Sequence, residues 1–134
     1  MLSHVNIGAN DVAGMAAFYD AVLLPLGITR FYSDPDVCGW RGPADGPALY
    51  VGRPFDGGPA GVGNGSMCAF RAPGRDAVDA VHRLALAHGG TSEGAPGLRR
   101  YKPGYYGAYF RDPEGNKLHV VAMLPPGEAA QLIE

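Results

Sequence analysis

Hydrophobic and polar residues alternate along this chain in short runs that turn-forming residues separate. Residues 2–8 alternate with a period of two, which predicts a strand with one set of side chains on each face. Residues 12–23 carry apolar side chains at helical spacing, behind two residues that can cap a helix. Pro25 and Gly27 end this helix. Further short strands are predicted at residues 28–32, 37–41 and 48–53.

A similar series of elements follows a glycine-rich stretch. A strand is predicted at residues 66–72 and a helix at 76–88, whose His82 and His88 we expect to face solvent. Later strands are predicted at 105–111 and 117–123, with a weaker signal near 98–101 and a short helix or frayed tail after Pro125.

The two halves repeat in register. One constant offset pairs Met15 with Val78 and Phe18 with Val81, and a later one pairs Tyr50 with His119. The repeat predicts an α+β fold of two tandem βαβββ modules that form a concave sheet with helices outside. We expect a single domain over residues 1–134. Within it, module 1 covers about 1–55, a linker about 56–65, module 2 about 66–124 and a C-terminal tail 125–134.

Composition narrows the classes of partner. The 134 residues are 46% hydrophobic and 18% charged, with a formal net charge of −2 and no basic run. This balance predicts a globular protein and disfavours nucleic acid and anionic membranes as partners. Because no signal peptide or long apolar run is recognisable, we expect a cytoplasmic location. Cys38 and Cys68 are expected to be reduced thiols.

Four stretches carry a resemblance to a known family. They are His4-Val-Asn-Ile-Gly8, Met15-Ala-Ala-Phe-Tyr-Asp-Ala-Val22, Ala69-Phe-Arg-Ala-Pro73 and Arg111-Asp-Pro-Glu-Gly-Asn-Lys-Leu-His119. In these the chain resembles the vicinal oxygen chelate superfamily, the glyoxalase, bleomycin-resistance and extradiol-dioxygenase group. The resemblance implies paired βαβββ modules, a homodimer, and a divalent metal held on the first and last strands of each module. Carried onto this sequence, the metal positions are His4, Tyr50, Met67 and His119.

These positions depart from the pattern of the metal-using relatives, because none of them is a carboxylate. Strand parity nonetheless places them, together with Asn6, on the face of the sheet that is turned away from the helices. The remaining ligands, His4 and His119, suit Zn²⁺ or Ni²⁺ better than Fe²⁺, Mn²⁺ or Mg²⁺. We therefore expect either a divalent metal, with Zn²⁺ or Ni²⁺ favoured over the others, or no metal.

The same residues are candidates for chemistry. His4 and His119 are predicted as catalytic groups, since an imidazole titrates near neutral pH and can act as a base. The predicted substrate-binding residues are Tyr50, Met67, Asn6, Arg71, Trp40 and Tyr105.

Two principal functions remain open. One is an enzyme of the lyase or dioxygenase type that acts on a small oxygenated organic molecule in the cleft between the modules. The other is a metal-free protein that sequesters a small molecule, as the drug-binding relatives do. A structural subunit of another protein is a third, weaker interpretation.

Overall fold

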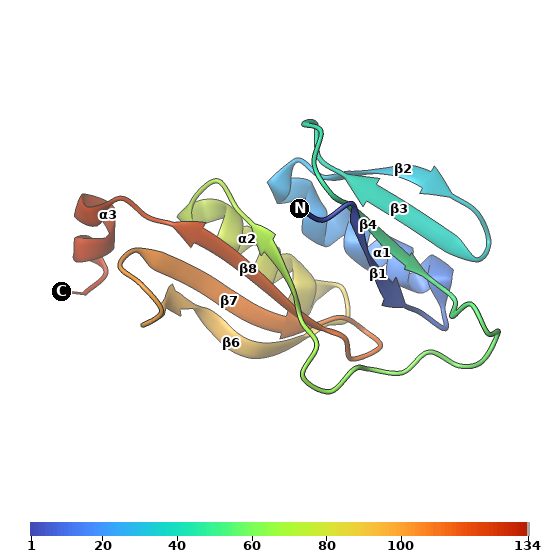
Figure 1. Cartoon of the computed structure of the whole chain (residues 1–134). Coiled ribbons are helices and arrows are strands. Elements are labelled where there is room, and N and C mark those ends of the chain that lie inside the picture. Colours follow the sequence, from blue (N-terminus) through green and yellow to red (C-terminus); the bar gives the residue numbers. More distant parts are fainter. Residues whose placement is uncertain (134) are drawn as a thin grey trace.

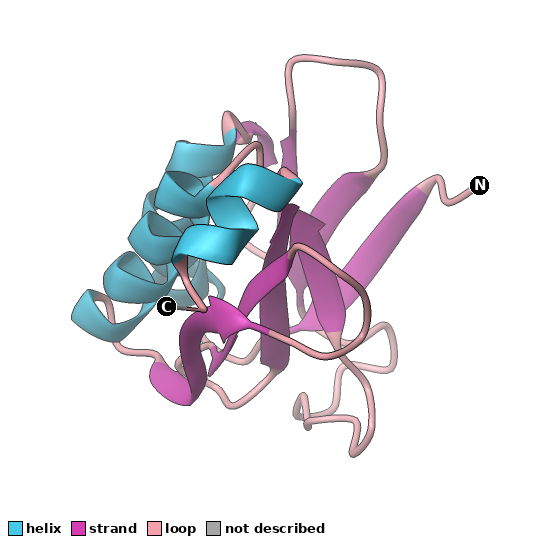
Figure 2. Cartoon of the chain, turned by 90° about the vertical axis from the view of Figure 1, so that its left-hand side faces the viewer, coloured by secondary structure: helices cyan, strands magenta, loops and turns pink. Residues whose placement is uncertain are grey.

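The computed structural model describes residues 1–133 and contains two four-stranded sheets with both long helices on one side (Figures 1 and 2). Module 1 consists of β1 (His4–Gly8), α1 (Val12–Leu23), the 3-10 turn η1 (Leu24–Leu26), β2 (Thr29–Ser33), β3 (Val37–Arg41) and β4 (Ala48–Gly52). Module 2 consists of β5 (Cys68–Arg71), α2 (Arg75–Ala87), β6 (Thr91–Leu98), β7 (Tyr105–Arg111), β8 (Lys117–Met123) and the short α3 (Pro126–Gln131).

The two sheets have the same topology. Their strand orders are β1-β4-β3-β2 and β5-β8-β7-β6, and in each the first strand lies parallel to the last while the other pairs are antiparallel. The predicted fold of two βαβββ modules is therefore confirmed. Residues of β1 and β5 line the same hollows, so the parallel edges of the two sheets lie next to each other.

The helix-facing side of both sheets forms one hydrophobic core. Leu49 and Val51 of β4 are buried there, as are Leu118 and Val120 of β8, which confirms the alternation expected from the sequence. A single cluster of buried residues draws on both modules, and α1 packs against α2 across it. Neither module therefore has a complete core of its own.

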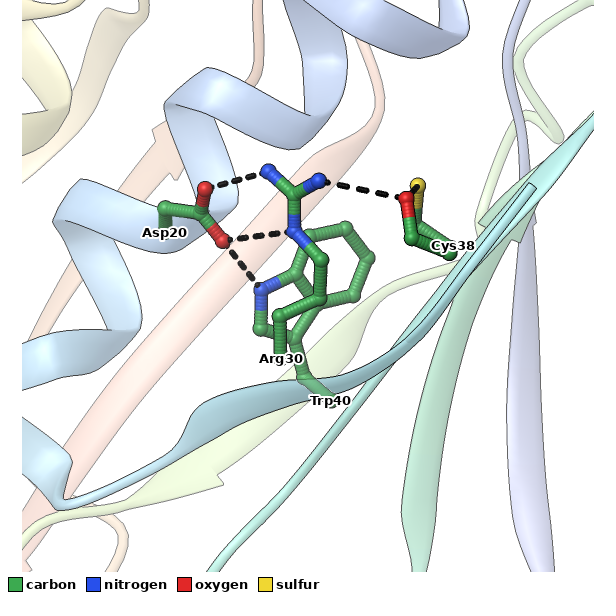
Figure 3. A network of polar contacts seen from close by, with 5 residues as sticks. Asp20, Arg30, Cys38 and Trp40 are labelled. Atoms are coloured by element: carbon green, nitrogen blue, oxygen red, sulfur yellow. Dashed lines mark hydrogen bonds and ion pairs between the residues drawn. The ribbon is translucent and has the colours of Figure 1, made fainter. Parts of the chain in front are cut away.

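Trp40 belongs to this core and not to the opposite face. It is completely buried, and its indole N–H donates to Asp20 of α1 at 2.9 Å (Figure 3). Arg30 of β2 forms an ion pair with the same carboxylate and lies 5.7 Å from the centre of the Trp40 ring. This network ties strands β2 and β3 to the helix.

The turn between β7 and β8 joins the two modules. The Asp112 carboxylate accepts backbone N–H groups of Glu114 and Asn116, and it also accepts the Tyr19 hydroxyl of α1 at 2.6 Å. The Glu114 carboxylate accepts the backbone N–H groups of Asn10 and Asp11 at 2.7 and 2.8 Å, just before α1 begins. Burial and the nearby Asp112 raise the pKa of Tyr19 well above its ordinary value, so this phenol stays a donor.

Strand β6 differs from the expectation. Its residues, Thr91–Leu98, lie N-terminal to the weak signal at 98–101, and shifts in its pairing with β7 near Gly94 break the period-two pattern. The prediction that His82 faces solvent was wrong for the same reason. His82 is buried against β6, and its Nε2 lies 2.9 Å from Ser92 Oγ. None of the helices within residues 1–133 has the length and apolar character that crossing a membrane requires.

Candidate functional site

The candidate site lies on the side of the sheets away from α1 and α2, which we call the open face. Because Leu118 and Val120 point into the core, His119 between them points to the open face. By the same alternation His4, Asn6 and Tyr50 lie on this face. Met67 precedes β5 and is 45% exposed.

His119 lies flat against strand β7. Its ring is stacked on Tyr109 with 4.0 Å between centroids and 11° between planes, and it is nearly parallel to Tyr105 at 5.8 Å. Between the two tyrosines is Gly107, where an added Cβ would come within 2.6 Å of His119 Cε1. The missing side chain at Gly107 thus makes the room in which the imidazole lies, and His119 is only 1% exposed.

Both ring nitrogens of His119 have protein partners. Nδ1 lies 2.8 Å from the Ala108 carbonyl oxygen, which can only accept, so Nδ1 carries a proton and donates. In the neutral ring Nε2 is then the acceptor, and the Tyr105 hydroxyl donates to it at 2.7 Å. Burial lowers the pKa of His119, and the cations Arg99 and Lys117 act in the same direction, so the ring is neutral near pH 7.

A cluster of aromatic side chains surrounds this ring. Its members, which we call the tyrosine cluster, are Tyr101, Tyr105, Tyr109 and His119. The Tyr101 and Tyr109 hydroxyls are 3.0 Å apart, and Arg99 and Lys117 each lie 5.5 Å from the centre of the Tyr109 ring. Burial and the hydrogen bond to Tyr101 raise the pKa of Tyr109 to about 12.

Module 1 carries a smaller aromatic group on the open face. The His4 and Tyr50 rings meet edge to face at 5.4 Å, and Phe31 contacts Tyr50 in the same manner at 5.9 Å. The Arg41 guanidinium lies 4.0 Å from the centre of the Phe31 ring. Ser3 Oγ is 2.9 Å from His4 Nδ1, while the structure of residues 1–133 contains no hydrogen-bond partner for Nε2.

A hollow of about 350 Å³ lies where β1 meets β5, and we call it the inter-module hollow. Its polar lining includes Asn6, Ser66, Asn116 and Lys117, and residues 61–63 line it as well. Lys117 therefore connects the two features: its ammonium group lies over the Tyr109 ring, and the residue also lines the inter-module hollow.

The predicted site residues thus separate into groups. Asn6 and Met67 line the inter-module hollow, His4 and Tyr50 form the module 1 group, and Tyr105 and His119 belong to the tyrosine cluster. Arg71 is exposed at the end of β5 and lines neither the inter-module hollow nor an aromatic group within the described chain. Trp40, expected to bind substrate, instead faces α1.

The predicted substrate-binding residues include Tyr105 but not Tyr101, Tyr109 or Lys117. Tyr105 and Tyr109 stand two positions either side of Gly107, so the period-two pattern already placed both on the face of His119. The contacts of Tyr101 with Tyr109 carried no sequence signal, since Tyr101 lies in a loop.

The four positions at which the resemblance implies a metal do not form a suitable donor set. Both nitrogens of His119 are engaged with Tyr105 and Ala108, and the thioether of Met67 and the phenol of Tyr50 are poor ligands. Within residues 1–133 no three His, Cys, Asp or Glu side chains come together around a possible ion. The residues present therefore do not fit a divalent metal.

Two βαβββ modules with a ligand-sized hollow at their junction define a class of small α+β proteins. Comparison of the chain with known protein families shows which family of this class it belongs to. The model of the Glyoxalase/Bleomycin resistance protein/Dioxygenase superfamily matches residues 1–120, so the chain belongs to this superfamily. A glyoxalase/bleomycin resistance protein from Albidiferax ferrireducens T118 has 39% identity and a TM-score of 0.83, over 93% of this chain and 99% of that one.

More distant structures share the fold. A glyoxalase/bleomycin resistance protein/dioxygenase family enzyme from Burkholderia phytofirmans PsJN is 24% identical, with a TM-score of 0.70 over 91% of this chain and 98% of that one. A lactoylglutathione lyase from Agrobacterium tumefaciens is 20% identical, with a TM-score of 0.64 over 91% and 92%. Comparison with the curated proteins finds no match.

Proposed function

We propose that this protein binds a small, planar, anionic aromatic molecule on its open face without the help of a metal. The observation that carries the proposal is the position of Lys117. Its ammonium group lies over the Tyr109 ring, and its side chain also lines the inter-module hollow. A ligand ring on the tyrosine cluster would therefore place an attached carboxylate or phenolate within reach of a cation.

The charges around the cluster favour an anion. Arg99 and Lys117 both approach Tyr109, and neither forms an ion pair with an acidic side chain of residues 1–133. Arg111 on the same face is already paired with Glu93. Cations that form no ion pair within residues 1–133 and lie beside an aromatic surface suit a ligand that supplies both a ring and a negative charge.

The tyrosine cluster is suited to holding such a ring in one orientation. Stacking between Tyr105 and Tyr109, together with two hydrogen bonds, fixes His119 before any ligand arrives. The Tyr105 hydroxyl donates its proton to His119, so its oxygen lone pairs remain to accept a hydrogen bond from a ligand N–H or O–H. A preordered surface loses little side-chain entropy on binding, which favours affinity.

Isothermal titration calorimetry with 1-naphthoate in the presence of EDTA tests this proposal. The wild-type protein is expected to bind 1-naphthoate more tightly than 1-naphthalenemethanol, which has the same ring but no charge. Lys117→Met should weaken 1-naphthoate binding by roughly tenfold to a hundredfold, because a hydrogen bond to a charged group contributes about 1.5–3 kcal/mol.

Arg83→Met is the control, since Arg83 is an exposed cation on α2 and does not line the inter-module hollow. It should bind 1-naphthoate as the wild type does. Equal affinity of the wild type for the charged and neutral ligands, or an unchanged affinity in Lys117→Met, would contradict the proposal.

A second candidate function is proton transfer with His4 as the base. It is favoured by one observation, the exposed imidazole whose Nδ1 lies beside Ser3 Oγ while Nε2 is left without a protein partner in residues 1–133. If Ser3 accepts from Nδ1–H, Nε2 presents its lone pair to the open face. Deuterium exchange at the carbons of dihydroxyacetone in D₂O, followed by NMR, tests this function. The wild type should accelerate exchange and His4→Gln should not; equal rates in both would exclude it.

A further inference from the structure

A second hollow lies at the other end of module 2 from the inter-module hollow. The inter-module hollow is next to the start of β8, at Lys117, whereas this one begins where β8 ends. It lies between the loop of residues 99–104 and the C-terminal helix α3, which Figure 1 shows beyond the end of β8. We call it the C-terminal groove, and its volume is about 460 Å³.

The floor of the C-terminal groove is apolar and continuous with the core. Leu124 and Ala129 are 6% and 8% exposed, and Leu98 packs against the same core cluster. At the edge of the groove, the aliphatic side chain of Ile133 is 77% exposed. The groove therefore offers an apolar surface against which an apolar ligand can pack.

Within residues 1–133, the charged residues at the rim of the groove are all basic. Arg99, Arg100 and Lys102 line it, and its described lining contains no Asp or Glu. The Arg99 guanidinium is held by the Ala95 carbonyl oxygen at 2.7 Å, whereas Arg100 and Lys102 are exposed and form no ion pair within residues 1–133. This concentration of cations contrasts with the net charge of −2 of the whole chain.

We propose that the C-terminal groove binds a single-chain amphipathic carboxylate, such as a medium-chain fatty acid. The alkyl chain would lie over Leu98, Leu124 and Ala129, and the carboxylate would lie between Arg100 and Lys102. Small-molecule sites have volumes of roughly 300–1,000 Å³, mostly apolar linings and a few polar groups that fix orientation. The groove has all three properties, and Arg99 at its rim also lies over the Tyr109 ring of the site proposed for a planar anion.

Calorimetric titration of the full chain with octanoate tests this inference. Octanoate should bind, while 1-octanol should bind more weakly and octyltrimethylammonium should not bind. The double variant Arg100→Glu/Lys102→Glu should weaken octanoate binding by about fivefold to tenfold, since exposed ion pairs contribute roughly 0.2–1 kcal/mol each. Both residues are exposed, so this variant is expected to fold.

The control variants separate this site from the others. Arg83→Glu reverses an exposed charge on α2 and should leave octanoate binding unchanged, as should Lys117→Met. Ala130→Trp should fill the groove from α3 and block octanoate while leaving 1-naphthoate binding intact.

Three results would overturn the inference. They are an absence of octanoate binding, equal binding of octanoate to the wild type and the double variant, and equal binding of octanoate and octyltrimethylammonium. Apart from these binding results, a wild-type dimer in sedimentation analysis that Ala130→Trp converts to a monomer would also overturn it, because a second copy of the chain would then occupy the groove.

Discussion

At the scale of single residues, the open face depends on how His119 is accommodated. A histidine on a strand ordinarily stands up from the sheet, but here the absence of a side chain at Gly107 lets the ring lie down between Tyr105 and Tyr109. The ring then becomes part of the floor of the tyrosine cluster. Its nitrogens bind the protein itself, which leaves His4 as the histidine with an available nitrogen on this face.

Gly107→Ala should therefore destabilise the protein. The new Cβ would come within 2.6 Å of His119 Cε1, and the overpacking is expected to cost about 1–3 kcal/mol. The free energy of unfolding from urea denaturation measures this loss. Gly46→Ala is the control, because a Cβ at position 46 meets nothing within 4 Å. Equal stability of the two variants would contradict the described position of the ring.

Acid should weaken the fold through the same histidine. Burial lowers the pKa of His119 in the folded protein, so the unfolded chain takes up the proton first as pH falls. The stability that neutral His119 contributes is thus complete above about pH 6.5, the ordinary pKa, and is lost as pH falls toward the lowered value. His82 acts in the same direction, because burial also lowers its pKa.

Unfolding free energies measured between pH 8 and pH 5 check this prediction. The loss of stability on acidification should be smaller in His119→Gln than in the wild type, and smaller again when His82→Gln is added. His88→Gln, at the exposed end of α2, should retain the wild-type dependence. If the unfolding free energy of the double variant falls with pH as steeply as that of the wild type, the two buried histidines are not the source of the pH dependence.

At the scale of elements, the turn between β7 and β8 holds the two modules together. Its sequence, Asp112-Pro-Glu-Gly-Asn116, is part of the resemblance to the superfamily, yet its polar groups bind other parts of the chain. Glu114 accepts the backbone N–H groups of Asn10 and Asp11, and Asn116 donates to the Gly8 carbonyl oxygen. The turn thereby connects module 2 to the segment that leads into α1.

Glu114→Ala should lower the free energy of unfolding by about 1 kcal/mol, the usual net contribution of a hydrogen bond. The variant leaves two backbone N–H groups near the start of α1 without their carboxylate partner. Chemical denaturation measures the change, with Glu128→Ala on the exposed side of α3 as the control. A loss no greater than that of the control would mean that solvent replaces the carboxylate without cost.

The elements differ in how far the sequence predicted them. Helix α1 and strands β3, β7 and β8 have the expected bounds because their apolar periods are unbroken. Strand β6 was misplaced because its irregular pairing near Gly94 removes the alternation. Parity likewise placed His119 on the correct face, but it could not reveal the stacked ring, which depends on the neighbouring strand.

At the scale of the whole molecule, the two modules share one core and one set of interlocking hydrogen bonds. The hydrophobic cluster draws on both, and Tyr19 of module 1 donates to Asp112 of module 2. The repeat therefore describes how the chain is built and not how it divides into stable units. The homodimer implied by the resemblance stays a prediction.

Scanning calorimetry should accordingly detect a single unfolding transition. The calorimetric and van't Hoff enthalpies should agree, as they do for a cooperative domain. Two resolved transitions, or stable folding of residues 1–63 without the rest of the chain, would contradict the shared core. Sedimentation at the same protein concentration identifies the oligomeric state to which the enthalpies refer.

The central claim is that the open face binds a planar anion through its own side chains. Its most direct test is the affinity for 1-naphthoate, measured by calorimetry on protein treated with EDTA and on protein reconstituted with Zn²⁺, Ni²⁺, Fe²⁺ or Mn²⁺. The described donors do not fit a divalent ion, so we predict the same dissociation constant in every preparation. Binding that occurs only after a metal is added would contradict the claim.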